Sequence, residues 1–516
     1  NPFIGTGGHG HTYPGATLPH GMVQLSPDTR LEGWDGCSGY HYSDSFIYGF
    51  THTHLSGTGC SDYGDILLMP GNGTPSCDNK KYGSRFSHKN EHASPGYYTV
   101  KLSDDNIDVE LTSTERVGIH KYHFNRSKDK YVIIDLKHRD EVISSSIKIE
   151  DDYTVSGLRR SKAWANDQYV FFVMKFSAPI FKYGIWLNDS LTKVNLQSVD
   201  NGKNIKAYFK FNQLPNNDLL VKVAISPVSV EGAKKNLNAE ASSFTFDQIL
   251  KQAKLKWNQE LSHIEVNSKN TEKLKVFYTA LYHTAIVPNI NMDVDSNYRG
   301  RDQQIHKADD FVYYSVFSLW DTYRAAHPLY SLIDKKRTLD YVKTFLAQYQ
   351  QGGRLPVWEL ASCETDCMIG YHSVPVIVDA FQKGIKNFDT KLALEAMIKS
   401  ANWNHLGLPA FNNKGMINVE DEHESISKTL EYAYDDYCIA LFARQIGQNE
   451  IAQEYFNKAS FYKNIFDANT GFMRPRKNGN WINPFDPREV NNHFTEANSW
   501  QYSFYFPQDV SGYIEM

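Results

Sequence analysis

The chain has 516 residues, a formal net charge of −5, and 41% hydrophobic and 22% charged residues. This length is several times that of a typical domain of roughly 100 to 200 residues, so two or more domains are expected. The composition is that of a globular protein. It argues against a broad basic surface for nucleic acid, and no apolar run approaches the roughly 20 residues that span a bilayer.

Aromatic residues make up 14% of the chain, with 32 Tyr, 29 Phe and 9 Trp. Such a content suits a surface that stacks on sugar rings, and it suits a large aromatic core equally well. The six cysteines lack the paired C-x-x-C spacing of a zinc site and do not define a disulfide scaffold. The chain begins at Asn1 without an initiator Met or an apolar leader, which fits a mature form whose export signal has been removed.

Residues 1–242 are predicted to form an antiparallel β-sandwich. Short runs of alternating or β-branched residues recur there, separated by Gly, Asn and Asp clusters. The clearest of these runs lie at 97–102, 131–136, 168–176 and 219–226.

Near residue 243 the apolar period changes to that of a helix, so residues 243–265 are predicted to be a linker helix between domains. Helical patterns follow at 271–287, 314–332, 335–351, 371–385, 389–403, 424–446, 449–467 and 496–510. They pair as αα-hairpins, of which an (α/α)6 toroid needs six. Residues 266–516 supply about four of them, so we expect a catalytic toroid domain that is truncated or is part of a longer protein.

The segment 423–442 carries two acids on a predicted helix. Glu431 and Asp435 lie one turn apart, on the flank of an apolar stripe made of Ile426, Leu430, Ala433, Tyr437 and Leu441. Burial at such a boundary can raise the pKa of a carboxyl and keep it protonated near neutral pH, as a glycosidic general acid requires. The spacing alone fits a solvated acidic face with Lys428 as partner equally well.

The segment 354–373 is unusually polar and aromatic for the start of a helix, since it contains Trp358, Glu359, Glu364, Asp366 and His372. Several hydrogen-bonding groups beside a Trp are typical of a sugar pocket. Cys363 and Cys367 are better explained as small buried residues than as metal ligands, because no second Cys or His pair supports a site. A single histidine such as His372 is more often a core residue than a catalytic one.

Two shorter motifs carry candidate polar groups. In 317–330, Trp320, Asp321 and Arg324 fall within one helical turn. An Asp321–Arg324 pair can orient a carboxylate towards sugar hydroxyls, or it can be a purely structural ion pair. In 493–502, oxygen-bearing side chains of the kind that Ca²⁺ prefers are contributed by Glu496, Asn498 and Gln501, although this spacing does not by itself define a site.

The N-terminal segments 5–30, 33–44 and 51–65 are dense in Gly, His and aromatic residues. Long Gly-rich loops of a sandwich can reach a neighbouring cavity and supply rigid contacts, with Trp34 as a stacking platform. A metal site is the less favoured explanation of the alternating histidines His9, His11, His52 and His54. GTGGHG is also a poor phosphate loop, because no Lys and Ser/Thr follow it.

Taken together and in order, these segments resemble glycoside hydrolase family 92. The resemblance covers the whole chain and is carried by NPFIGTGGHGHTYPGA, GWDGCSGYHYSD, FTHTHLSGTGCSDYGD, FSLWDTYRAAHP, CETDCMIGYHS, EYAYDD and EANSWQY. It implies an N-terminal β-sandwich (a supersandwich) packed on an (α/α)6 toroid. It also implies an exo-acting, inverting, Ca²⁺-dependent α-mannosidase that releases terminal mannose from N-glycan or yeast mannan chains, exported to the periplasm or cell surface of a Gram-negative bacterium.

Carried onto matching positions, the resemblance implies that Glu431 is the general acid and that Trp34 and Asp321 line the terminal mannose subsite. The part of the family that meets the leaving sugar and the ion corresponds to His493 and Glu496.

The remaining expectations complete this site. Trp358 and Glu359 are expected to bind substrate, and Asn498 and Gln501 to bind the metal. The family's general base, an Asp in a Gly-Asn-Asp-type loop, has no match here and is expected beyond residue 516. Acid and base of an inverting enzyme stand about 6.5 to 9.5 Å apart, so Asp435 is expected to orient the acid rather than to act as base.

Two other classes of protein stay open on the sequence. A disaccharide phosphorylase or a polysaccharide lyase can share this architecture; the first needs a basic phosphate pocket and the second a Tyr/His/Arg cluster for uronic acids. A non-catalytic glycan-binding protein would bind mannose without turnover.

Overall fold

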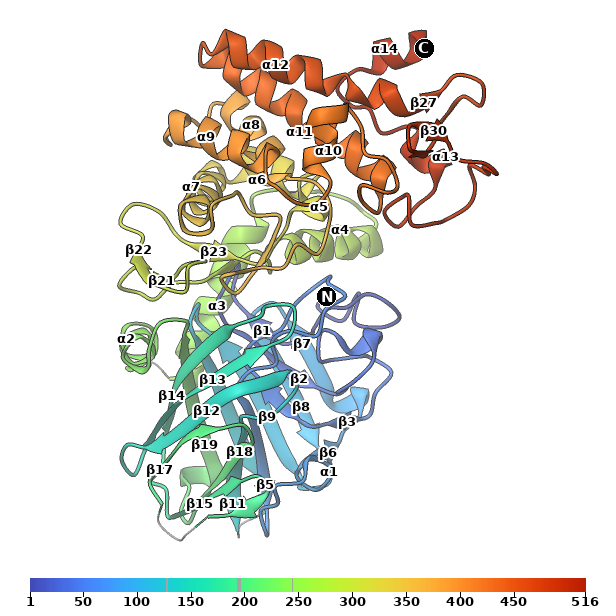
Figure 1. Ribbon diagram of the computed structural model, residues 1–516. Coiled ribbons are helices and arrows are strands. Elements are labelled where there is room, and N and C mark those ends of the chain that lie inside the picture. Colours follow the sequence, from blue (N-terminus) through green and yellow to red (C-terminus); the bar gives the residue numbers. More distant parts are fainter. Residues whose placement is uncertain (127–128, 193–195, 244) are drawn as a thin grey trace. The chain divides into compact units, whose positions relative to one another are not determined.

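The computed structural model describes residues 1–126, 129–192, 196–243 and 245–516 (Figure 1). These residues form two compact units. The sandwich unit comprises Asn1–Arg299, Gln303–Val316 and Leu360–Cys363, and the helical unit comprises Gly300–Asp302, Phe317–Glu359 and Glu364–Met516. The prediction of an antiparallel β-sandwich followed by a helical part is therefore confirmed. No helix in these described ranges combines the length and apolar character needed to cross a membrane.

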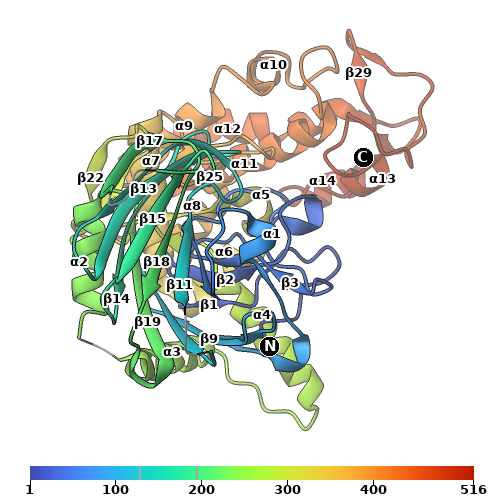
Figure 2. The same cartoon turned by 90° about the horizontal axis from the view of Figure 1, so that it is seen from below.

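Two antiparallel sheets make up the sandwich unit (Figure 2). One has eight strands in the order β1 (Ala16–Thr17), β2 (Gln24–Asp28), β4 (Gly49–Thr51), β5 (Leu67–Asn72), β11 (Lys130–Asp135), β18 (Ile205–Phe211), β15 (Lys182–Leu187) and β16 (Ser190–Leu191). The other has nine strands in the order β17 (Ser198–Gly202), β12 (Glu141–Ile149), β13 (Thr154–Lys162), β14 (Gln168–Phe176), β19 (Asp218–Ser226), β10 (Val117–Phe124), β9 (Ile107–Ser113), β8 (Tyr97–Leu102) and β7 (Glu91–Ser94).

The four clearest sequence runs are the strands β8, β11, β14 and β19, each within one residue of its predicted bounds. In β8, Tyr98, Val100 and Leu102 are buried and alternate with half-exposed residues, as expected of a strand with one face on the core. β11 is an inner strand between β5 and β18, and it is buried along its whole length. Apolar side chains of both sheets meet in one continuous core.

Helices cover the outer face of the nine-stranded sheet. Apolar residues of α2 (Val230–Glu240) and α3 (Phe246–Leu261) pack on β10, β14 and β19. α3 is the predicted linker helix; it begins with a Thr245–Gln248 capping box, and Phe244 lies outside the described residues. The ring of Trp257 in α3 packs at a tilt against that of Tyr282 in α4 (Thr271–Thr284), with 4.6 Å between centroids. This packing groups α4 with the sandwich unit, so the division between the units falls later than the expected boundary at residue 265.

The other elements of the sandwich unit are short. They are η1 (Trp34–Gly36), β3 (Phe46–Ile47), α1 (Asn79–Tyr82), β6 (Ser84–Arg85), η2 (His88–Asn90), η3 (Pro215–Asn217), β20 (Asn289–Ile290), β21 (Asn297–Arg299), β22 (Ile305–Lys307) and β23 (Tyr314–Ser315).

The helical unit opens with β24 (Phe317–Ser318). Its longer helices are α6 (Ala326–Ile333), α7 (Lys335–Gly352), α8 (Ser373–Gln382), α9 (Thr390–Ala401), α11 (Ser425–Gln445) and α12 (Asn449–Ala459). Its short elements are α5 (Leu319–Thr322), β25 (Trp358–Leu360), β26 (Cys363–Glu364), α10 (Leu408–Lys414), η4 (Phe461–Ile465), β27 (Phe466–Asp467), β28 (Phe472–Met473), β29 (Arg476–Lys477), β30 (Asn480–Trp481), α13 (Ser499–Tyr502) and α14 (Val510–Glu515). β25 and β26 each have residues in both units.

Three helix predictions in this unit are wrong in extent. The segment 314–332 begins as strand and then divides into α5 and α6, and the segment 496–510 forms only α13 and the start of α14. In the second case Pro507 lies in the interruption, where it removes a backbone donor. The segment 449–467 is helical only as far as Ala459 in α12 and then forms η4 and β27. α10 was not predicted.

Candidate active site

Glu431 lies in the middle of α11 and is fully buried. A carboxyl pays a large desolvation cost there unless it is hydrogen-bonded. The indole N–H of Trp320 and the hydroxyl of Tyr502 donate to its Oε1 at 3.1 and 3.0 Å. Nη2 of Arg324 lies 3.5 Å from the same oxygen, and Nε2 of His372 lies 2.7 Å from Oε2. The carboxyl therefore has a partner on both oxygens.

His372 connects Glu431 to Asp435, the acid one helical turn later. Its Nδ1 lies 2.8 Å from Oδ1 of Asp435, and the backbone N–H of Tyr371 donates to Oδ2 at 2.8 Å. The imidazole side chain is fully buried and stacks on the ring of Tyr323, with 4.0 Å between centroids. The two acids and the imidazole thus form one buried Glu–His–Asp array.

The charges of the array decide where its protons lie. Burial opposes protonation of His372, but the charge and hydrogen bond of Asp435, together with those of Glu431, raise its pKa to about 9. Burial also raises the pKa of Asp435, against the pull of the imidazole. Nδ1 of His372 faces the carboxyl of Asp435 and Nε2 faces that of Glu431, so the imidazole can hold a hydrogen towards either acid.

A third buried acid of α11 stands beside this array. The hydroxyl of Tyr371 donates to Oδ1 of Asp436 at 2.7 Å, and burial raises the pKa of Asp436 to about 8. Its hydrogen bond goes to Tyr371 rather than to the imidazole of His372. Asp436 is therefore a neighbour of the array with the same burial but a different partner.

The solvated-face explanation of the two acids is wrong. Glu431 and Asp435 are both 0% exposed, and Lys428 pairs instead with Glu422 at 3.2 Å. The predicted apolar stripe is also only partly correct, because its C-terminal members are half-buried. α11 packs against α8, α9, α12 and η4, so its sides are covered almost all round, and this covering places the acids deeper than a flank position would.

Asp321 follows the indole that contacts Glu431. It is exposed and accepts a hydrogen bond from Oγ of Ser318. The predicted Asp321–Arg324 pair does not form; the guanidinium donates to the carbonyl of Trp320 at 3.1 Å and faces Glu431. Arg324 is thus a partner of the buried acid.

Asp321 and Glu496 gather near one thiol. Burial, and then the charges of Asp321, Glu496 and Glu424, raise the pKa of Cys367 to about 11. Sequence positions far apart are therefore brought to one acidic neighbourhood of the helical unit. Cys363 is buried, as the sequence predicted, whereas Cys367 is only half-buried.

Trp358 and Glu359 lie in β25, with 2% and 0% of their surfaces exposed. The loop that follows is fastened by Glu364, whose carboxylate accepts from the backbone N–H groups of Val357 and Trp358 at 2.9 and 2.8 Å. It also lies 3.5 Å from Nη2 of Arg301. Glu364 therefore shapes the loop, and the indole of Trp358 is a core side chain rather than an exposed platform.

The segment that carries His493 and Glu496 runs along the start of α11. The backbone N–H of Ile426 donates to the His493 carbonyl at 3.1 Å, and that of Thr495 donates to Oγ of Ser427 at 2.9 Å. His493 is half-buried, and burial lowers its pKa. The carboxylate of Glu496 is exposed.

Asn498 and Gln501 form a capping box at the start of α13. The backbone N–H of Gln501 donates to Oδ1 of Asn498 at 3.2 Å, and that of Asn498 donates to Oε1 of Gln501 at 3.1 Å. Both amide oxygens therefore already accept one bond each. Over the described ranges, no three or more His, Cys, Asp and Glu side chains are grouped so that they could hold a metal ion.

In the sandwich unit, Trp34 is 58% exposed on the short helix η1. The ring of His11 meets it edge-on at 4.2 Å, and that of His9 lies at 5.1 Å while its Nδ1 is 2.6 Å from Oδ1 of Asp35. The indole is therefore fixed in place with much of its surface open, as a stacking platform requires.

The other two alternating histidines lie inside the sandwich. Nδ1 of His52 is 2.7 Å from the Ile66 carbonyl, and Nδ1 of His54 is 2.8 Å from that of Gln24. These contacts use the histidines to fasten strands and give no support to a metal site.

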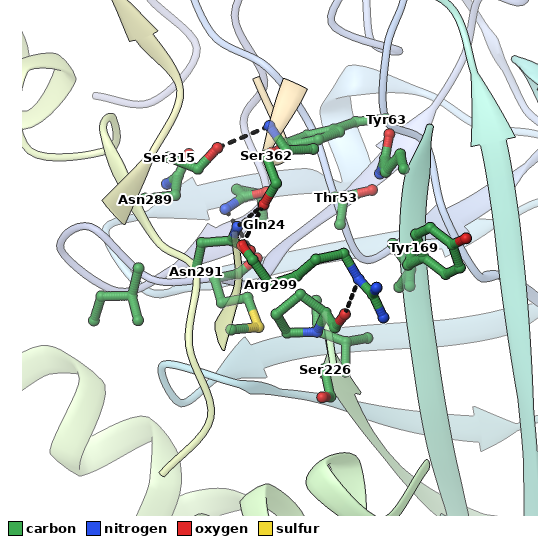
Figure 3. Close-up of a pocket in the computed structure, with 17 residues that line it drawn as sticks. Gln24, Thr53, Tyr63, Tyr169, Ser226, Asn289, Asn291, Arg299, Ser315 and Ser362 are labelled. Carbon is green, nitrogen blue, oxygen red and sulfur yellow. Dashed lines mark hydrogen bonds between the residues drawn. The ribbon is translucent and has the colours of Figure 1, made fainter. Parts of the chain in front are cut away.

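A small cavity of about 40 Å³ lies within the sandwich unit (Figure 3). Polar groups that line it include Gln24, Thr53, Asn289, Asn291 and Ser362. Its Arg299 lies over the Tyr169 ring at 4.0 Å and donates to the Pro227 carbonyl at 3.0 Å. A space of this size holds a few water molecules and is far below the roughly 300 Å³ at which small-molecule pockets begin, so it is a poor candidate for a sugar site.

Family models match almost the whole chain. Residues 1–226 match the glycosyl hydrolase family 92 N-terminal domain, and residues 232–516 match the glycosyl hydrolase family 92 catalytic domain. The chain belongs to glycosyl hydrolase family 92. This membership confirms the resemblance seen in the sequence and makes the chain a glycoside hydrolase.

Solved members of family 92 have the same fold. A family 92 α-mannosidase from Bacteroides thetaiotaomicron, in complex with mannoimidazole, is 37% identical with a TM-score of 0.95; the match covers 100% of this chain and 71% of that one. An inverting family 92 mannosidase from Bacteroides thetaiotaomicron VPI-5482 is 32% identical with a TM-score of 0.91 and the same coverages, 100% and 71%. An uncharacterized secreted glycosidase from Arthroderma benhamiae is 26% identical over 589 residues, covering 100% of this chain and 71% of that protein.

Within this family 92 chain, sequence reasoning undervalued His372 and did not consider Tyr502 as a partner of Glu431. The available signal was the spacing of Glu431 and Asp435: two acids one turn apart on a helix can hold the two nitrogens of one imidazole. That imidazole comes from a loop about 60 residues earlier in the chain, and no local pattern links it to α11.

Proposed function

We propose that the chain is an exo-acting, inverting α-mannosidase that removes terminal mannose from glycans of the N-glycan or yeast mannan type. The observation that carries the proposal is the fully buried Glu431, joined through His372 to Asp435, in a chain of family 92. The names of its relatives, an α-mannosidase and an inverting mannosidase, support the substrate and the stereochemistry. The secreted relative supports export, which we propose to the periplasm or cell surface of a Gram-negative bacterium.

Glu431 is the proposed general acid. The proton that it shares with Nε2 of His372 passes to the glycosidic oxygen as the bond to the anomeric carbon breaks, and the leaving sugar departs as an alcohol. Water attacks the opposite face of the ring and gives a proton to a general base, which inverts the configuration. None of the residues named here is assigned the role of that base. Asp435 is joined to the acid by a single imidazole, so we assign it a positioning role and not that of the base.

A protonated Glu431 carries an O–H group, which needs a neighbour that can accept a hydrogen bond. The indole of Trp320 and the guanidinium of Arg324 can only donate. When Nδ1 of His372 carries a hydrogen, its Nε2 is an acceptor and can hold the Glu431 O–H. The hydroxyl of Tyr502 can also accept a hydrogen bond from Glu431 instead of donating one. Asp435 thus fixes the tautomer of His372 that permits a protonated acid.

Substrate contacts are proposed for the remaining residues. Trp34 stacks on a sugar ring, which its exposed indole supports, and Asp321 accepts hydrogen bonds from hydroxyls of the terminal mannose. His493 and Glu496 contact the leaving sugar. For Trp358 and Glu359 we propose a supporting role, since their burial in β25 suits the shaping of a pocket wall.

A Ca²⁺ requirement is also proposed. When bound, the ion would grip sugar hydroxyls and favour a flattened ring. Glu496 offers an exposed carboxylate, and Asn498 and Gln501 each keep one oxygen lone pair after capping α13. These residues fit part of the six to eight oxygens that Ca²⁺ takes, and water and sugar hydroxyls would supply the rest.

The test of the proposed acid is Glu431→Gln. Glutamine keeps an oxygen towards Trp320 and Tyr502 and presents its amide N–H to Nε2 of His372, so the fold should be retained. We expect turnover of α-mannobiose to fall by about 10² to 10⁴-fold and that of dinitrophenyl α-mannoside far less, because dinitrophenolate leaves without a proton. Asp436→Asn, on the same helix, is the control. Near-normal turnover of mannobiose by the Glu431→Gln variant would reject the assignment.

A further inference from the structure

The imidazole of His372 is enclosed on both of its faces. One face stacks on the ring of Tyr323, with 4.0 Å between centroids and 17° between planes. A Cβ on Gly370 would lie 2.2 Å from Nε2 of His372 and 2.6 Å from each of the two carbons bonded to that nitrogen. Such a position lies above the ring rather than in its plane, and the stacked phenol leaves no room on its own side. Gly370 therefore covers the opposite face.

Two features favour glycine at position 370. Its φ of +81° lies in the left-handed region, which glycine adopts without steric cost. Its Cα also approaches the imidazole too closely for any residue that carries a Cβ. The next residue continues the contact, because the backbone N–H of Tyr371 donates to Oδ2 of Asp435 at 2.8 Å. The segment 370–372 is therefore shaped to the Glu–His–Asp array.

Tyr323 is itself held in place. Its hydroxyl lies 2.5 Å from that of Tyr505, and the guanidinium of Arg324 lies over its ring, 4.8 Å from the centroid. Only 9% of its surface is exposed. Trp320, Tyr323 and Arg324 stand at positions i, i+3 and i+4, which share one side of a helical turn. The short helix α5 and the turn after it thus supply a donor, a ring and a cation to the array.

The plane of the imidazole matters because both of its nitrogens are used. Rotation about the bond between Cβ and the ring is soft. It moves Nδ1 and Nε2 out of line with the carboxyl oxygens of Asp435 and Glu431, and hydrogen bonds weaken steeply when they bend. A wall on each face of the ring restricts this rotation without occupying either nitrogen.

We propose that Tyr323 and Gly370 are positioning residues for the general acid, because they clamp the imidazole of His372 in line between Glu431 and Asp435. This inference rests on the proposed mannosidase function. It deepens that function by adding two residues that act on the acid through His372.

The sharpest test of the clamp is Gly370→Ala, whose new Cβ must displace the imidazole. Gly384→Ala is the matched control: Gly384 has a φ of +88° and nothing within 4 Å of its Cβ position, so only the backbone strain is shared. In Gly370→Ala we expect kcat on mannobiose to fall about 10²-fold, with a far smaller loss on dinitrophenyl α-mannoside. The control should keep the wild-type ratio of the two substrates. Circular dichroism checks that each variant is folded.

A second pair of variants tests the other face. Tyr323→Leu removes the stacked ring and Tyr323→Phe keeps it, so we expect kcat on mannobiose to fall about tenfold in the first and to be largely recovered in the second. The control is Tyr298→Leu. Tyr298 stacks on Tyr313 with 3.9 Å between centroids and 17° between planes, in a contact that involves no residue of the array. Its loss should leave the ratio of the two substrates unchanged.

The titration of His372, followed by NMR of protein with isotope-labelled histidine, gives a readout that needs no turnover. The pKa of His372 is about 9 in wild type. It should fall in Gly370→Ala and in Tyr323→Leu, because a displaced imidazole loses the charges and hydrogen bonds of Asp435 and Glu431 that raise it. The basic limb of kcat should move to lower pH with it.

The outcomes separate the clamp from the proposed function. Equal losses on both substrates with an unmoved titration of His372 overturn the clamp, since they indicate a structural role. An equal loss in Gly384→Ala and Gly370→Ala also overturns it, since backbone strain then explains both. If wild type releases no mannose while the titration still shifts in Gly370→Ala, the mannosidase function is rejected and the clamp is retained. No mannose release with an unmoved titration rejects both.

Discussion

Asp435→Asn tests the role of the buried array most directly. Asp435 accepts from two donors: the backbone N–H of Tyr371, which can only donate, and Nδ1–H of His372. An asparagine must turn its oxygen to Tyr371 and therefore presents its N–H₂ to Nδ1. The neutral imidazole is then forced to carry its hydrogen on Nε2, where it donates to Glu431.

The size of the expected loss of kcat in Asp435→Asn follows from the hydrogen-bond partners of Glu431. When His372 carries its hydrogen on Nε2, the imidazole donates to the carboxyl of Glu431, as do the indole of Trp320 and the guanidinium of Arg324. Only the hydroxyl of Tyr502 can then accept a hydrogen bond from Glu431. The carboxylate form is then favoured and the acid loses its proton. General acid catalysis contributes about 10² to 10⁴-fold, so we expect a loss of kcat of that size on mannobiose at neutral pH. Dinitrophenyl mannoside should be hydrolysed with a much smaller loss.

The pH profile gives a second readout. The pKa of His372 is raised to about 9 with Asp435 as the leading support. The shared proton of wild type is therefore retained until pH rises through about 9, and the basic limb of kcat should fall there. Without the Asp435 charge the last proton leaves at lower pH, so the basic limb moves towards the ordinary histidine value near 6.5.

The assay is kcat against pH for both substrates, with Asp436→Asn as the matched control. Asp436 is equally buried and bonds Tyr371, but its partner is a hydroxyl that can donate or accept. The control should keep its activity and its basic limb. A loss in Asp435→Asn that is equal on both substrates, with an unmoved basic limb, would refute the tautomer argument and indicate a structural role.

Three further outcomes are expected. In wild type the pKa of Asp436 is about 8 in the folded protein, above the ordinary value of 3.8. The free energy of unfolding that this carboxyl contributes is therefore fully present below pH 3.8 and is lost as the pH rises through about 8. The Asp436→Asn variant lacks this titration, so its free energy of unfolding should depend less on pH. Urea unfolding should show the variant gaining on the order of 3 kcal/mol on wild type between pH 4 and 7. Trp34→Ala should raise KM for mannobiose about tenfold without changing the fold seen by circular dichroism. Removal of Ca²⁺ with EGTA should abolish mannose release, and added Ca²⁺, but not Mg²⁺, should restore it.

Much of the fold could be predicted because it depends on local periodicity. β8 is buried in alternation against one core, and the bounds of β8 and β14 agree with the sequence runs. α11 was found by its spacing of apolar residues, although that spacing suggested one buried face. It could not reveal that α8, α9 and α12 cover the helix on several sides, because those contacts join segments far apart in sequence.

Contacts between segments far apart in sequence also limited the prediction of the site. Glu431 and Trp34 stand in recognisable motifs, whereas the partners that give each of them a function come from elsewhere: Tyr502 lies 71 residues after the acid. Asn498 and Gln501 were chosen for their oxygen atoms, yet the structure shows a second use for those atoms, the capping of α13. Residue type and spacing cannot distinguish a helix cap from a metal ligand.

His372 shows how burial and chemistry combine here. A single buried histidine is usually a core residue, and this one does lie in the core. Its importance follows from its two neighbours, because most groups around Glu431 can only donate hydrogen bonds and would hold it ionised. A general acid in such surroundings needs one partner that accepts, and only a histidine whose other nitrogen is fixed by a carboxylate supplies that partner reliably. Asp435 therefore has a chemical reason to lie one turn from Glu431, and that reason is the tautomer of the imidazole between them.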